Sequence, residues 1–270
     1  MNYKAFALDL DGTLLVGEDL PEENIVALKR AKAAGIQIMM ATARWSQIAE
    51  RTAAKMGISD LVIACSGAQV RDPVSNQDIF DRRLPVEFCE ELFSICNQER
   101  CIATVTFDDD VRVKLDGEPD PDTLAEEMSW VPELIVDPAN MPRVAAVQGS
   151  GCVAKIRATL EERYRESVNI FDSIGPSGKI IIIITAKAGT KGAALQAACD
   201  HLGIERHQVV AFGDAENDVE MFRAAGAAVA MGQSDAATKA EADYVTLANH
   251  EAGVAHAVNL ILDHGRLPQN

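Results

Sequence analysis

Apolar and polar residues follow one another in blocks along the first 65 positions, in a way typical of buried strands joined by amphipathic helices. Residues 3–10, 36–41 and 61–65 are almost unbroken apolar runs, as expected of strands covered on both faces of a sheet. Between them, a helical spacing of apolar residues begins at Pro21 and stops at Gly35, and a second one fills 46–56. Short joints between such units predict a parallel sheet with right-handed crossovers.

The same alternation returns near the C-terminus, but the middle of the chain differs. Near the C-terminus the pattern predicts helices at 191–202, 217–224 and about 251–262, and strands at 209–213, 227–230 and 244–246. The middle holds a helix at 86–97, strands at 102–107, 111–115, 143–148, 169–172 and 179–185, and a helix at about 152–165. The tripeptide Asp108-Asp109-Asp110 joins two of these strands and predicts an antiparallel hairpin.

This change of pattern predicts two domains of different class. Residues 1–83 and 187–270 are expected to form an α/β core with a Rossmann-like parallel sheet, and residues 84–186 a small inserted α+β domain.

Charge and hydropathy narrow the classes of partner. The 270 residues carry 25 Lys and Arg against 41 Asp and Glu, a formal net charge of −16, which disfavours nucleic acid and anionic membranes. The aliphatic run at 180–184 is far shorter than the roughly 20 residues of a membrane span. Acid appears at Asp9, too early for a signal peptide. We therefore expect a soluble cytoplasmic protein, and the oligomeric state stays open.

The six cysteines indicate a reducing environment. They lack the Cys-x-x-Cys pairs and the His spacing of zinc sites. The sequence thus favours buried, reduced thiols over disulfides or a structural metal site.

Four polar clusters follow predicted strands or begin a predicted helix, where an open parallel sheet collects its ligands. They are Asp9-Leu10-Asp11-Gly12-Thr13, the pair Thr42 and Arg44, the helix-starting Lys191, and Gly213-Asp214-Ala215-Glu216-Asn217-Asp218. Taken singly, each is an ordinary turn, helix cap or surface lysine. Taken together, they predict carboxylates that converge on one small volume and repel one another unless a cation lies among them. Mg²⁺, which prefers carboxylate, water and phosphate oxygens, satisfies such an arrangement.

In order and spacing, these four motifs resemble those of the haloacid dehalogenase-like phosphohydrolases. The large insert before Lys191 is similar to the α+β cap of their Cof-type subgroup, and the resemblance spans essentially the whole chain.

The resemblance implies a Mg²⁺-dependent phosphatase in which Asp9 is the nucleophile and Asp11 the general acid and base. The side chains of Asp9 and Asp214, with the backbone carbonyl of Asp11, would hold the metal, and Asp218 would orient these ligands. The phosphoryl group would be bound by Thr42, Ala43, Arg44, Lys191 and Asn217. Arg44 has an equally good interpretation as a surface ion pair.

Two positions depart from the Cof-type pattern. Ala43 stands where the subgroup usually has Gly, so a Cβ is expected near the phosphate, and Ser66 stands where Asn is common.

The predicted substrate is a small phosphate ester, most simply a sugar phosphate, bound between core and cap, with hinges near 82–84 and 186–189. Residues 84–184 carry a net charge of −10, which mildly disfavours polyanionic substrates. The sequence does not separate hydrolysis from phosphomutase or phosphotransferase chemistry. A non-catalytic phosphometabolite sensor is a further alternative, although a binding protein has no need of a paired nucleophile and acid.

Overall fold

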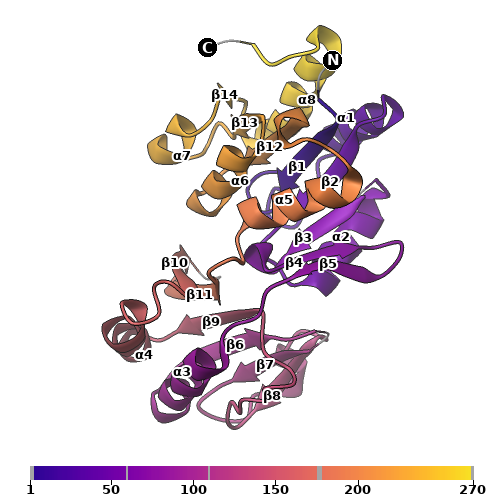
Figure 1. Cartoon of the computed structure of the whole chain (residues 1–270). Helices are drawn as coiled ribbons and strands as arrows, with labels where there is room; N and C mark the ends of the chain where they lie inside the picture. Colours follow the sequence, from indigo (N-terminus) through magenta and orange to yellow (C-terminus); the bar gives the residue numbers. More distant parts are fainter. Residues whose placement is uncertain (1–2, 59, 109, 175–177, 269–270) are drawn as a thin grey trace. The chain divides into compact units, whose positions relative to one another are not determined.

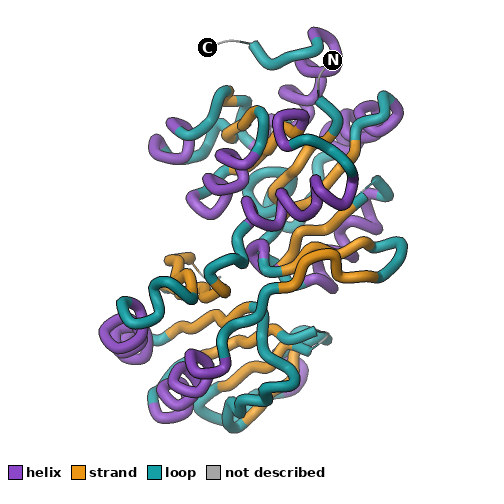
Figure 2. The backbone as a smooth tube through the Cα atoms, viewed as in Figure 1, coloured by secondary structure: helices purple, strands orange, loops and turns teal. Residues whose placement is uncertain are grey.

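The computed structural model describes residues 3–58, 60–108, 110–174 and 178–268 (Figures 1 and 2). The chain divides into two compact units, each described here by itself. The core unit lies within residues 1–80 and 190–270, and the inserted unit comprises residues within 81–189. Among the described residues, no helix has both the length and the apolar character that crossing a bilayer requires.

The core unit is built on an eight-stranded sheet. Its strands, in spatial order, are β14 (Tyr244–Val245), β13 (Ala227–Ala230), β12 (Val209–Gly213), β1 (Ala5–Asp9), β2 (Gln37–Ala41), β3 (Leu61–Ala64), β4 (Gln69–Asp72) and β5 (Gln77–Asp81). The strands from β14 to β3 pair in parallel, as predicted, whereas β4 pairs with β3 in antiparallel fashion. The α/β class is therefore confirmed, with a mixed edge that the sequence pattern did not predict.

Helices cover the core sheet on both faces. They are α1 (Glu22–Ala33), α2 (Ser46–Met56), α5 (Lys191–Leu202), α6 (Val219–Ala224), α7 (Ala236–Ala240) and α8 (Gly253–His264). α5 packs beside α6, and α1 packs beside α8 (Figure 1). Ala5 and Ala7 of β1 lie in the apolar cluster under α5 and α6, and because strand side chains alternate, Phe6 and Leu8 face the other layer.

The inserted unit is an α+β layer. Its sheet has the order β10 (Val168–Ile174), β11 (Ile180–Ala186), β9 (Val144–Gln148), β6 (Ile102–Thr106), β7 (Val111–Lys114) and β8 (Met128–Val131). The predicted hairpin is confirmed, since β6 and β7 pair antiparallel, although Asp109 in its joint lies outside the described residues. Helices α3 (Val86–Gln98) and α4 (Ser150–Ile156) pack side by side on an apolar cluster.

The helix predicted at 152–165 is an α-helix only as far as Ile156, and Arg157–Glu161 continue it as a π-turn. The Thr159 hydroxyl donates a 2.7 Å hydrogen bond to the Lys155 carbonyl oxygen. A side-chain donor at this carbonyl competes with the regular helical bond, which is a physical reason for the altered turn.

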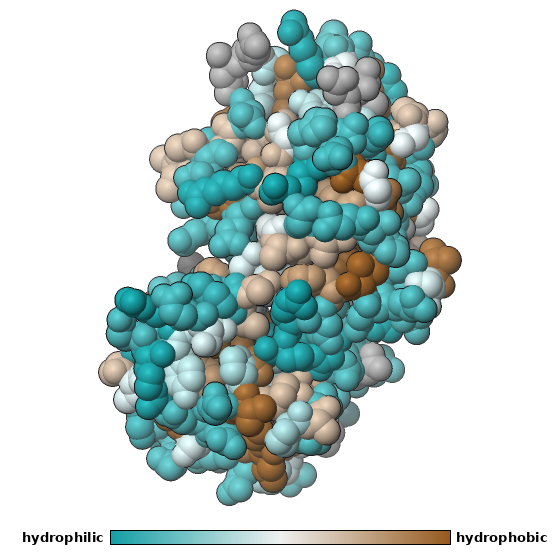
Figure 3. All heavy atoms as spheres, viewed as in Figure 1, coloured by the Kyte–Doolittle hydropathy of each residue, from teal (hydrophilic) through white to brown (hydrophobic). Residues whose placement is uncertain are grey.

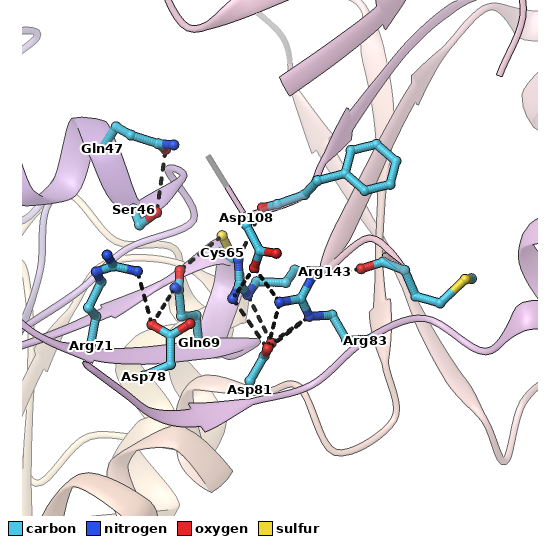
Figure 4. Close-up of polar contacts among 12 residues, drawn as sticks. Ser46, Gln47, Cys65, Gln69, Arg71, Asp78, Asp81, Arg83, Asp108 and Arg143 are labelled. Carbon is cyan, nitrogen blue, oxygen red and sulfur yellow. Dashed lines mark hydrogen bonds and ion pairs between the residues drawn. The ribbon is translucent and has the colours of Figure 1, made fainter. Parts of the chain in front are cut away.

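The first residues of the inserted unit are tied to it by a buried guanidinium. Arg143 is 1% exposed and its Nε lies 2.9 Å from Asp81 Oδ1, while its Nη2 lies 3.0 Å from Asp108 Oδ1. Arg83 binds the same two carboxylates, with 2.6 Å from its Nη2 to Asp81 Oδ2 (Figure 4). Two cations thus face two anions.

The same view shows the unpredicted edge hairpin of the core unit, where Asp78 of β5 accepts hydrogen bonds from Gln69 and Arg71 of β4 (Figure 4). Hydrophilic side chains cover most of the face in Figure 3.

Candidate active site

The candidate site begins where β1 ends. Asp9 is the last residue of that strand and pairs with Ala41, the last residue of β2, while Leu8 pairs with Phe212 of β12. Register therefore brings the loops that follow β12, β1 and β2 to one edge of the core sheet. These loops carry Asp214, Asp11 and Thr42, as the four-motif pattern predicts.

Lys191 lies at the centre of the site. It begins α5, is 1% exposed, and its Nζ lies 2.6 Å from both Asp9 Oδ1 and Asp218 Oδ1. Burial alone would lower the pKa of this ammonium, but the charges of Asp218 and Asp9 raise it above its usual range. Lys191 is consequently a permanent cation.

The carboxylates of the site outnumber this cation. Carboxylate oxygens of Asp9, Asp214 and Asp218 lie within 4.8 Å of one another. Burial raises the pKa of Asp9 well above its usual range, and the neighbouring charges of Asp218 and Asp214 add to the rise while Lys191 opposes it. Burial, and then the charge of Asp218, raise the pKa of Asp214 to about 6. Three acids against one ammonium leave two negative charges without a partner.

This donor set fits a hard dication. Asp218 is already committed, because its Oδ1 accepts from Lys191 and its Oδ2 accepts from the backbone N–H groups of Asp214 (2.9 Å) and Ala215 (3.1 Å). Asp9 and Asp214 are the acids that retain oxygens for a metal ion. A few carboxylates with open positions for water and phosphate suit Mg²⁺.

Asp11 lies apart from this buried group. Its side chain is 49% exposed and forms a forked ion pair with Arg44, with 2.5 Å between Oδ1 and Nη2. Arg44 also reaches Glu18, at 3.0 Å, and these two carboxylates raise the pKa of the guanidinium. Arg44 thus ties the loop after β1 to the loop after β2.

The remaining predicted residues occupy different environments. Thr42 is fully buried and its Oγ1 accepts a 3.1 Å hydrogen bond from the backbone N–H of Arg44. Ala43 and Asn217 are exposed. Lys191 donates its hydrogen bonds to Asp9 and Asp218.

Close backbone contacts hold these loops in place. Gly67 has φ +93°, and a Cβ there would lie 2.2–2.4 Å from backbone atoms of Thr190 and Lys191. Cys65 and Ser66 before it also have positive φ, of 55° and 56°. Such conformations are costly for residues other than glycine, so the turn after β3 is shaped to receive the start of α5.

Sequence reasoning did not single out two groups that complete the site. Thr13 is fully buried and donates a 3.1 Å hydrogen bond to Asp214 Oδ1. Gln233 donates to the carbonyl oxygen of Gly12. Thr13 stands inside the first motif and could have been found there, whereas no pattern in the sequence points to Gln233.

The comparisons with known proteins agree with this geometry. A family model described as haloacid dehalogenase-like hydrolase matches residues 6–258. The chain is 28% identical to the 5-amino-6-(5-phospho-D-ribitylamino)uracil phosphatase of Bacillus subtilis, covering 96% of this chain and 95% of the relative. It is 26% identical to the phosphoglycolate phosphatase of Methanosarcina acetivorans, covering 98% and 99%. A solved subclass IIB sugar phosphatase superposes with a TM-score of 0.78 at 23% identity, covering 97% and 99%, which shows the shared fold.

Proposed function

This chain belongs to the haloacid dehalogenase-like hydrolase family and is a phosphatase, and we propose that it cleaves a small phosphorylated metabolite, such as a sugar phosphate, through an aspartyl-phosphate on Asp9. The observation that carries the proposal is the bridge of Lys191 between Asp9 and Asp218. A buried cation 2.6 Å from a buried carboxylate oxygen favours the ionised form that a nucleophile requires, and so opposes the burial that raises the pKa of Asp9.

Asp9 attacks phosphorus, and the bond from phosphorus to the ester oxygen breaks. Lys191 remains beside the incoming oxygens and neutralises the charge of the transferring phosphoryl group. The Thr42 hydroxyl, the backbone N–H of Ala43 and the exposed Asn217 side chain are the further groups proposed to bind phosphoryl oxygens.

Asp11 is proposed to give its proton to the leaving alcohol and then to take one from the water that hydrolyses the aspartyl-phosphate. Its exposed carboxylate suits a group that exchanges protons with substrate and solvent. Arg44 holds this carboxylate in the free protein, and an incoming phosphate offers Arg44 an alternative anionic partner.

Mg²⁺ is the proposed cofactor, and Asp9, Asp214 and the backbone carbonyl of Asp11 are the proposed ligands. When bound, such an ion neutralises phosphate oxygens that would otherwise repel the nucleophile. Thr13 and Asp218 act on this set by holding Asp214 and the loop around it.

The inserted unit, with 84–186 as its predicted extent, is proposed to select the substrate. Relatives that match almost the full chain are named for a ribitylaminouracil phosphate and for phosphoglycolate. The shared chemistry of these substrates is one phosphomonoester on a small polar molecule, and the individual compound is a matter for experiment.

The test is phosphate release from a panel of phosphorylated metabolites with and without Mg²⁺. Asp9→Asn should abolish turnover on every active substrate while circular dichroism stays unchanged. Asp19→Asn replaces an exposed acid of the same loop and should leave turnover intact. Full activity of Asp9→Asn would refute the nucleophile, and phosphoryl transfer to an added acceptor sugar in place of phosphate release would establish the mutase alternative.

A further inference from the structure

Three cysteines of the inserted unit meet in its interior, although one of them lies about 50 positions after the other two. Cys96 lies near the end of α3, Cys101 just before β6 and Cys152 in the first turn of α4. All three are free and buried, and their sulfur atoms lie within 4.8 Å of one another. Cys96 and Cys101 have the four-residue separation found in some zinc-ligand pairs, but Cys152 lies 51 positions after Cys101, so only the tertiary structure reveals the cluster.

The backbone brings these sulfurs together at a point of very close packing. Gly149 precedes α4 with φ +137°, and a Cβ there would lie 2.9 Å from the Arg100 carbonyl oxygen and 3.2 Å from Cys101 Cα. The turn before α4 therefore presses against the segment that carries Cys101. This contact places Cys152, three residues later, beside it.

We propose that Cys96, Cys101 and Cys152 form a binding site for a thiophilic d10 dication, Zn²⁺, in the inserted unit. Thiolates around one zinc ion lie about 2.3 Å from the metal and hence roughly 3.8 Å from one another. The sulfur atoms of the triangle are at most 4.8 Å apart, so they exceed this spacing by no more than about 1 Å. In binding, three S–H groups lose their protons to solvent and three S–Zn bonds form, with no change of oxidation state.

The charges around the cluster suit a dication. Three thiolates and Zn²⁺ carry one net negative charge, and the buried Lys114 ammonium is the nearby compensating cation. Hydrogen bonds from the Cys152 and Cys96 thiols, followed by the charge of Lys114, lower the pKa of Cys101, whereas the hydrogen bonds with Cys101 and burial raise the pKa of Cys96 and of Cys152. Lys114 also contacts the half-exposed Asp116, at 3.4 Å, while Glu99 pairs with Lys155.

Space for a fourth ligand lies beside Cys101. This residue lines a cavity of about 870 Å³, together with Gln148, Val153 and Arg157. Zinc usually takes four ligands, and an open fourth position filled by water is common where the protein supplies three. Within the described residues, no fourth Cys, His, Asp or Glu joins the group.

The experiment titrates the full, reduced, chelator-stripped chain with Zn²⁺ against a chromophoric competitor, in excess Mg²⁺ so that the carboxylate site is occupied. We expect one Zn²⁺ per chain, bound at least about 100-fold more weakly by Cys96→Ser, Cys101→Ser and Cys152→Ser. Cys89→Ser is the matched control, because Cys89 is buried in the same helix as Cys96 but outside the cluster.

X-ray absorption on the zinc-loaded wild-type chain keeps the proposal testable if a variant fails to fold. The expected spectrum shows three sulfur neighbours at about 2.3 Å. Absence of saturable binding, unchanged affinity in Cys101→Ser, equal loss in Cys89→Ser, or a shell of nitrogen and oxygen alone would each overturn the proposal. Because phosphatase activity is not the readout, these outcomes are independent of the mechanism at Asp9.

Discussion

Each unit contains a cluster of charged side chains, but the two clusters are balanced differently. In the inserted unit, Arg83 and Arg143 face Asp81 and Asp108, so two cations meet two anions. In the core unit, three carboxylates surround the single ammonium of Lys191. A balanced cluster is satisfied within the chain, whereas an unbalanced one stays unfavourable until something else binds. The difference separates a structural network from a candidate active site.

Replacing Lys191 would sharpen the contrast most, because it removes the only cation of the unbalanced cluster. Lys191→Ala should lower kcat/KM by about 10³-fold, the effect of losing a preorganised electrostatic partner. Phosphate release measures the contribution of Lys191 to catalysis, and thermal unfolding measures its contribution to stability. Lys187→Ala removes an exposed lysine nearby in sequence and should change neither. A lower melting temperature with full activity would mean that Lys191 is only structural.

Replacing Arg143 would break the balanced cluster. Arg143→Met removes the buried hydrogen bonds to Asp81 and to the Phe107 carbonyl oxygen while Arg83 still pairs with both carboxylates, and it should destabilise the inserted unit by about 1–3 kcal/mol. Urea unfolding followed by Trp130 fluorescence in a Trp45→Phe background reports on this unit. Arg163→Met removes a guanidinium that is 54% exposed and should cost about 0–1 kcal/mol. Equal effects of the two substitutions would contradict the distinction.

Adding a methyl group at Gly67 tests whether close packing positions Lys191. Gly67→Ala should cost about 3 kcal/mol and reduce activity, because its Cβ meets the backbone at the start of α5. Gly57 also has positive φ but has no neighbour within 4 Å, so Gly57→Ala should cost only about 1 kcal/mol and leave activity unchanged. Chemical denaturation and phosphate release distinguish the two, and matching losses would remove the steric argument.

Mg²⁺ should relieve the imbalance of the core cluster and stabilise the protein. The expected gain is about 2.7 kcal/mol at a free concentration 100-fold above Kd. The pKa of Asp214, raised to about 6, means that the folded protein holds this proton more tightly than the unfolded one. Without metal, stability should therefore fall as pH rises from about 4 to 6.

Because Mg²⁺ requires the ionised carboxylate, its stabilising effect should be larger at pH 7.5 than at pH 5. Thermal unfolding at several pH values, with MgCl₂ and with KCl at equal ionic strength, measures both the pH dependence of stability without Mg²⁺ and the pH dependence of the stabilisation by Mg²⁺. A Mg²⁺ effect that is independent of pH, or that is reproduced by KCl, would exclude this account.

Elements with strong apolar patterns were predictable, and polar edge elements were not. The helix at 191–202 and the strand at 209–213 are confirmed to the residue, and the runs at 36–41 and 3–10 contain β2 and β1, which are one and three residues shorter. β4, β5 and β8 were missed because they are short and mostly partly exposed, so they lack a continuous apolar run. α7 was missed because five residues are too few to show a helical period.

The order of motifs along the chain was enough to predict that Asp9, Asp214, Asp218 and Lys191 would come together, since parallel strands bring their carboxyl ends to one edge. The partner of each side chain was beyond sequence reasoning. Asp218 accepts a hydrogen bond from Lys191, and Asp11 pairs with Arg44. Rotamers and distances of a few ångströms decide such pairings, and a linear pattern contains neither.

The cysteines show the same limit most clearly. Their number and spacing predict free, buried thiols, and all six are free and buried. That three of them form one triangle depends on how α3, α4 and the segment before β6 pack over the sheet of the inserted unit. The periodicity of helices and strands depends on residues a few positions apart, so the sequence determines it. Contacts between residues 50 positions apart form only when the whole domain packs around its core.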